Sequence, residues 1–185
     1  MSKLRRFDEA ETYYLNALTF NPEMAEIYYN KSVRLKDEEG CVALEQSMAY
    51  LDKCIQINPL FIRAYINKAA LYRECNKELE AAEVLDKVVA TVYNEDFLMA
   101  VLQRGIAYRM TNNIPFALND FLFVLTFDSN NVQNLSNLAS VYFAMGNFVE
   151  AQYYARLGLA QSEKQDKHFC DKEMQEILSR ISFHR

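Results

Sequence analysis

Four primary amides recur along the chain at a nearly constant spacing, and their chemistry suits contact with a polypeptide backbone. Each stands two residues after a bulky residue, and the four are Asn30, Asn67, Gln103 and Asn137. An amide side chain offers both a donor and an acceptor, so it can pair with a backbone C=O and N–H together. Such a row could hold an extended peptide without reading its sequence. It could equally solvate a groove or bond between neighbouring helices.

Cations occupy a second recurring position, one residue after a large side chain at 35, 72 and 108. They are Lys36, Arg73 and Arg109. On a chain with a formal net charge of −5, this row would favour an acidic segment or a carboxylate, which Arg can bind through two parallel hydrogen bonds. The pattern fits solvated helix ends equally well, because cations there complement the helix dipole.

No set of residues is spaced for catalysis or for metal binding. His168 and Cys170 are close in sequence, but a zinc site needs about four ligands. The acidic turn at 36–40 lacks the alternating oxygen ligands of a calcium loop. The sequence has neither a Gly-rich phosphate loop nor a Ser or Cys nucleophile motif. We therefore expect no enzymatic activity, no metal and no cofactor.

The elements that position these residues follow from two alternating amphipathic patterns with steps of 34 to 37 residues. Small residues mark both patterns: Ala10, Ser47, Ala81, Ala117 and Ala151 in one, and Ser32, Ala69, Gly105 and Ala139 in the other. Helices approach closely only where small side chains meet. One hairpin cannot bury its own apolar face, so hairpins of this kind must stack. The period predicts an all-α solenoid of antiparallel helix pairs.

The expected helices lie near 5–20, 24–37, 42–57, 61–75, 78–91, 95–111, 115–127, 131–144, 147–162 and 167–183. Turn residues agree: Gly146 and residues 112–113 separate first from second helices, Pro22 and Pro59 follow second helices, and Pro115 begins one. The last helix is not a repeat. Its apolar stripe consists of Phe169, Met174, Ile177, Leu178 and Ile181. Such a stripe predicts a capping helix that covers the terminal edge of the solenoid.

The chain resembles the tetratricopeptide repeat (TPR) family over about residues 7 to 163. The motif residues are Tyr65, Ala69, Tyr72, Ala81 and Leu85 in the middle, and Leu135, Ala139, Tyr142, Gly146, Ala151 and Tyr154 near the end. The resemblance implies a right-handed superhelical solenoid over 1–163, with a half repeat and then repeats at 25–61, 62–97, 98–131 and 132–163. A capping helix at 164–185 would follow. The chain departs from the family in three respects: it has no Trp, the Pro that closes a unit is missing from the later units, and the unit that starts near Ala25 carries three extra residues around 36–43.

In this family the first helix of each unit lines a concave groove. The resemblance therefore places the four amides in that groove, like the asparagine ladders of TPR superhelices that bind extended peptides. It implies a non-enzymatic scaffold or adaptor with a protein or peptide partner. The alternative is a structural subunit of a large assembly, or a dedicated chaperone, packed through its solenoid edges. The clamp that grips heat-shock chaperones is not expected, because only Asn67 fits among its slots, which hold Tyr29, Val33, Asn67, Met99 and Gln103.

Composition argues against nucleic-acid binding, membrane insertion and secretion. The net charge of −5 argues against a nucleic-acid-binding surface, which is normally basic. The longest strongly apolar run, residues 121–127, is far shorter than the ~20 residues that span a bilayer. Basic residues at the N-terminus are not followed by the apolar stretch of a secretory signal. Four scattered cysteines without a CxxC pair predict a reducing compartment, the cytoplasm.

The N-terminal edge is a separate candidate interface. The helix near 5–20 is of the second type and has no first helix before it. Tyr13, Tyr14 and Leu18 would then lie exposed, and exposed apolar patches mark interfaces. We expect a second copy of the chain or a neighbouring subunit to cover them.

Overall fold

The computed structural model describes residues 12–14, 16–17, 19, 21, 24–35, 41–91, 94 and 96–183, and within these residues it contains helices and no strand. The helices are α2 (Ala25–Leu35), α3 (Cys41–Ile57), α4 (Ile62–Glu74), α5 (Glu78–Val89), α6 (Phe97–Met110), α7 (Ile114–Phe127), α8 (Val132–Ala144), α9 (Phe148–Gln165) and α10 (Asp171–Phe183), with a 3₁₀ turn η1 (His168–Cys170). Each helix predicted from residue 24 onward is present, with ends that differ by a few residues. None of the described helices is long and apolar enough to cross a bilayer.

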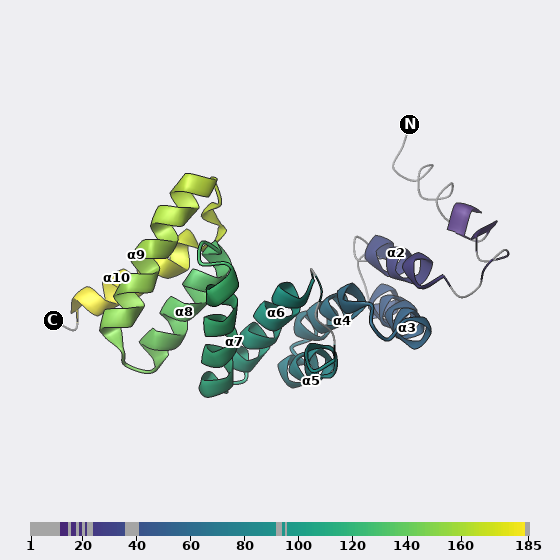
Figure 1. Ribbon diagram of the computed structural model, residues 1–185, viewed down its shortest axis with the longest axis horizontal. Helices are drawn as coiled ribbons and strands as arrows, with labels where there is room; N and C mark the ends of the chain where they lie inside the picture. Colours follow the sequence, from purple (N-terminus) through teal and green to yellow (C-terminus); the bar gives the residue numbers. More distant parts are fainter. Residues whose placement is uncertain are drawn as a thin grey trace.

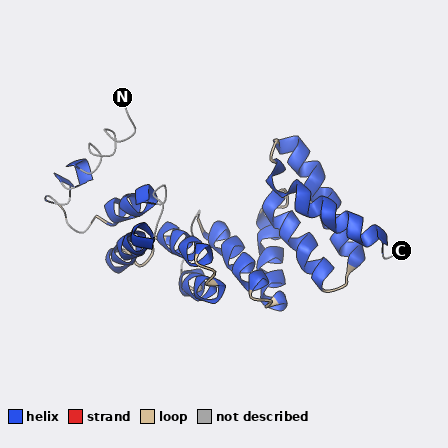
Figure 2. Ribbon diagram, turned by 180° about the vertical axis from the view of Figure 1, so that it is seen from behind, coloured by secondary structure: helices blue, strands red, loops and turns tan. Residues whose placement is uncertain are grey.

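The helices form hairpins that stack into an elongated array, from α2 at one end to α10 at the other (Figure 1). The hairpins are α2–α3, α4–α5, α6–α7 and α8–α9, and each of α4, α6 and α8 also packs against the second helix of the preceding hairpin. Seen from behind, the same array consists of helices joined by short loops (Figure 2). The limits of the individual repeats stay a prediction.

Small side chains lie where the two helices of a hairpin meet, as the sequence predicts. Ala81, Ala117 and Ala151 are fully buried. Gly105 of α6 marks one close approach, because an added Cβ would lie 2.7 Å from Cε1 of Phe121 on α7. Because a real Cβ does not tolerate that distance, the packing of α6 on α7 requires glycine at this position.

The turn inside the α4–α5, α6–α7 and α8–α9 hairpins has one recurring conformation. Its central residue has positive φ: 56° at Asn76, 59° at Asn112 and 77° at Gly146. The N–H of the following residue donates to the carbonyl of a tyrosine in the last turn of the first helix, at 2.8–2.9 Å. Asn and Gly are the residues that adopt this backbone readily. The predicted breaks at 112–113 and 146 are confirmed, as is Pro115 at the start of α7.

The capping helix is confirmed, with one correction to its apolar stripe. α10 packs against α9 and α8, and it buries Met174, Ile177 and Ile181. Phe169 is 67% exposed, so its place in the stripe is wrong. It lies in the 3₁₀ turn before α10, where the helical period that the stripe assumes does not apply.

Candidate functional site

The four recurring amides lie on the first helices α2, α4, α6 and α8, but their surroundings differ. Asn30 is exposed and Asn67 is half-buried. Neither side chain has a hydrogen-bond partner among the described residues. Gln103 is half-buried, and Asn137 is only 4% exposed. Their availability to a partner therefore falls along the chain.

Gln103 is held by a residue of the cationic row. Nη1 of Arg73, on α4, donates to Oε1 of Gln103 at 2.9 Å. The Nε of Arg73 also lies 3.5 Å from a carboxylate oxygen of Glu78. Among the described residues, the Nε2 of Gln103 reaches only the sulfur of Met99, at 3.7 Å, and a thioether is a weak acceptor. The acceptor of this amide is thus occupied, while its donor remains available for a stronger partner.

Two asparagines on α8 have internal roles. The Nδ2 of Asn137 donates to the carbonyl of Gln133, one turn earlier, at 2.9 Å. Asn134 is fully buried, and its Nδ2 donates to the carbonyl of Phe121 on α7 at 3.0 Å. Asn134 therefore joins the hairpins α6–α7 and α8–α9, and its position outside the recurring slot gave the sequence no signal for this role.

The last member of the cationic row binds the capping helix. Nη1 of Arg109 lies 3.1 Å from Oε1 of Glu173, on α10. The same carboxylate accepts the hydroxyl of Ser140 at 2.7 Å and that of Ser136 at 3.1 Å. Lys36, the first member of the row, lies outside the described residues. The ligand contacts predicted for both rows stay predictions.

Cavities open between packed helices of the described chain. One of about 530 Å³ lies between α3 and α4 and is lined by Leu44, Met48, Lys68 and Tyr72 among others. Another, of about 280 Å³, lies where α6, α8 and α10 meet. The described residues hold no group of three His, Cys, Asp or Glu side chains that could bind a metal ion.

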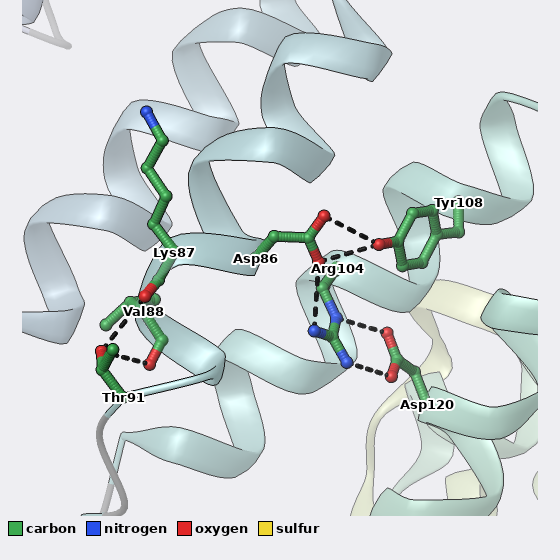
Figure 3. Close-up of polar contacts among 7 residues, drawn as sticks. All are labelled: Asp86, Lys87, Val88, Thr91, Arg104, Tyr108 and Asp120. Atoms are coloured by element: carbon green, nitrogen blue, oxygen red, sulfur yellow. Dashed lines mark hydrogen bonds and ion pairs between the residues drawn. The ribbon is translucent and has the colours of Figure 1, made fainter.

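A polar cluster closes the junction of α5, α6 and α7 (Figure 3). The guanidinium of Arg104 donates to both oxygens of Asp120, at 2.9 and 2.7 Å, and to Oδ1 of Asp86 at 3.1 Å. The hydroxyl of Tyr108 donates to Asp86 at 2.8 Å. Burial and this hydrogen bond raise the pKa of Tyr108 to about 12. Because Asp120 is 5% exposed and its partners are all internal, the cluster holds helices together.

Comparisons with known proteins place this geometry in a fold family. No protein-family model matches the chain. The human Protein O-mannosyl-transferase TMTC3 is 27% identical over 145 residues, which is 78% of this chain. The chain spans only 15% of the length of that relative.

Solved structures resemble the chain over most of its length. The crystal structure of MamA has a TM-score of 0.72 at 17% identity and covers 89% of this chain and 95% of its own. YrrB, a TPR protein with an unusual peptide-binding site, has a TM-score of 0.67 at 16% identity, with 91% of each chain covered. The chain has the tetratricopeptide-repeat fold. The predicted fold class, an all-α TPR solenoid of antiparallel helix pairs with a capping helix, is confirmed.

In this TPR solenoid, a serine, a histidine and an aspartate meet where α9 leads into α10. Ser162 Oγ and Asp171 Oδ2 lie 3.2 and 2.7 Å from the same ring nitrogen, Nδ1 of His168. In a catalytic triad the serine and the aspartate contact opposite ring nitrogens. Ser162 is also fully buried and donates to the carbonyl of Lys167. The trio therefore fixes the start of α10. The hydrogen bond that the His168 ring donates to the Asp171 carboxylate raises the pKa of His168.

The candidate interface at the N-terminal edge of the TPR array is only partly described. Tyr13 is 74% exposed and Tyr14 is half-buried. Leu18 lies outside the described residues. The predicted interface at this edge stays a prediction.

Proposed function

We propose that this TPR chain is a non-enzymatic scaffold or adaptor that binds an extended segment of a partner protein along its first helices. The observation that carries the proposal is the half-buried amide of Asn67, which has no hydrogen-bond partner among the described residues. A partly desolvated amide gains from pairing with a peptide backbone, because its donor and its acceptor can both be satisfied.

The neighbouring slots extend this surface. Asn30 precedes Asn67 on the recurring position and is exposed. Gln103 follows it and retains a donor, since its Nε2 bonds only to sulfur. An extended chain that crosses α2, α4 and α6 would meet these amides in turn. The likeness to YrrB, a TPR protein with a peptide-binding site, supports a peptide as the class of ligand.

One observation favours the alternative, a structural subunit or dedicated chaperone that packs through other surfaces. On α7, Phe116 and Phe127 are 56% and 57% exposed. The equivalent positions, 36 residues earlier, hold the exposed polar residues Glu80 on α5 and Thr91 just after it. Exposed aromatic side chains of this kind mark protein interfaces. Location in the cytoplasm stays a prediction under either proposal.

Site-specific photo-cross-linking separates the two. After affinity purification identifies the bound protein, p-benzoylphenylalanine replaces Asn67 on the first-helix side or Asn119 on the outer side of α7. We expect cross-links to the partner from position 67 and none from position 119. Cross-links from position 119 alone would reject the groove and support a subunit that packs through α7.

A further inference from the structure

Three donors from two first helices converge on one carboxylate at the α10 end of the array. Arg109 comes from α6, and Ser136 and Ser140 come from α8. Their distances to the oxygens of Glu173 are 3.1, 3.1 and 2.7 Å. Three donors satisfy both oxygens, which is the arrangement that a protein uses to bind an acidic side chain.

The ion pair between Arg109 and Glu173 is partly open to water. The side chain of Glu173 is 43% exposed and that of Arg109 is 26% exposed. Ion pairs so open to water contribute little to stability, because solvent screens them and competes for their hydrogen bonds. A carboxylate from another chain could therefore replace Glu173 at small cost, and α10 would remain anchored by Met174, Ile177 and Ile181.

The cavity of about 280 Å³ beside Glu173 supplies the room for exchange. Its wall includes Arg180 of α10, whose guanidinium lies 4.6 Å from the centre of the Phe143 ring. Arg180 has no ion pair among the described residues. The Nε of Arg109, which also lines this cavity, is buried without a hydrogen-bond partner in the described part of the chain. Two cationic side chains therefore retain unused donors next to the occupied carboxylate.

We propose that Arg109, Ser136 and Ser140 form a binding site for an acidic side chain of the partner segment, and that Glu173 occupies this site until the partner displaces it. The proposal rests on the proposed function, because it assigns an acidic residue to the part of the segment that reaches α8 and α10. Ser136 and Ser140 flank Asn137 in sequence, so the site continues the row of amides on the first helices. Glu173 thereby acts as a built-in competitor.

The test uses fluorescein-labelled hexaglutamate as the probe, hexaglutamine as the neutral control, and fluorescence anisotropy as the readout. Glu173→Gln removes the negative charge that competes for the three donors and changes the shape of the side chain little. Glu176→Gln is the matched control, because Glu176 lines the same cavity but contacts none of the three donors in the described structure. We expect Glu173→Gln to bind hexaglutamate about fivefold more tightly than the natural chain, and Glu176→Gln to change binding less than about twofold. Adding Arg109→Gln to Glu173→Gln should abolish the gain.

Two results would overturn the proposal. Equal gains from Glu173→Gln and Glu176→Gln would show only a general effect of charge. Loss of helicity in Glu173→Gln without tighter binding would show that Glu173 is a structural tie. If that variant fails to fold, the natural chain with and without Arg109→Gln decides: equal binding of hexaglutamate excludes the site. The hexaglutamate probe does not require Asn67. A negative result with hexaglutamate therefore leaves the photo-cross-linking test of the groove unaffected, and a negative photo-cross-linking result leaves the hexaglutamate test unaffected.

Discussion

The two halves of the first-helix surface differ in how much of their polar chemistry is already used. On α2 and α4, Asn30 and Asn67 have no partners within the described structure. On α6 and α8, Gln103 accepts from Arg73 and Asn137 bonds its own helix. The same slot thus serves different purposes in different repeats. The amides of the N-terminal half are open to a partner, whereas those of the C-terminal half are already bonded within the chain.

The junctions between hairpins show the same contrast. At the α3–α4 junction, Asp52 is the one carboxylate among the described residues that pairs with Lys68, and a cavity of about 530 Å³ remains. At the α5–α6 junction, Arg104 occupies the slot of Lys68 and Asp86 that of Asp52, with Asp120 as a second acceptor. A planar guanidinium can serve two carboxylates at once, whereas an ammonium is a point charge. Arg104 and Asp120 therefore close the junction that Lys68 leaves open.

The largest effect that we predict separates these two junctions. Asp120→Asn should lower the free energy of unfolding by about 2–3 kcal/mol, because Arg104, whose side chain is 20% exposed, loses its bidentate carboxylate partner. Asp52→Asn is the control and should cost about 0.5 kcal/mol or less, since that side chain is 59% exposed. Urea unfolding followed by circular dichroism measures both. Equal losses would mean that the two junctions do not differ in strength.

A smaller, pH-dependent effect tests how the C-terminal half is closed. Because Asp171 raises the pKa of His168 in the folded chain, the stability that this contact contributes is fully present below the ordinary histidine pKa, and it is lost as pH rises through the raised value. The melting temperature should therefore fall more between about pH 6 and about pH 8 in the natural chain than in His168→Gln. The same fall in both would show that another group titrates.

The sequence was sufficient to predict the helices and their hairpins, but not which polar side chains pair between helices. The helical period and small residues such as Gly105 predicted the hairpins, because close packing of helices requires small side chains at positions that recur with the repeat. The pairing of Arg109 with Glu173 joins residues 64 apart, which no 34-residue period connects. This pair depends on where α10 packs. An amphipathic pattern shows which face of a helix is buried, but not which polar side chains of two helices meet.

Part of the α5–α6–α7 polar cluster could have been predicted from the repeat pattern of the sequence. Asp52 and Asp86 are 34 residues apart, and Lys68 and Arg104 are 36 apart, so the pair of charges recurs with the repeat. Asp120 has no such counterpart, since Val84 occupies its slot on α5. A charged pair that recurs with the repeat can therefore be predicted from the sequence, whereas a buried partner that occurs once, such as Asp120, cannot.

The most direct test of the groove compares two asparagines, one open and one buried. Isothermal titration calorimetry with the segment identified by cross-linking would measure binding, and thermal melting would measure stability. We predict that Asn67→Ala weakens binding about tenfold with the melting temperature unchanged, because the peptide backbone loses its pair. Asn134→Ala should lower the melting temperature and leave the affinity of the folded chain intact, because its side-chain amide is buried and, among the described residues, bonds the carbonyl of Phe121. If Asn67→Ala instead destabilises the chain while the folded fraction binds as before, the amide row is structural and the proposed groove is contradicted.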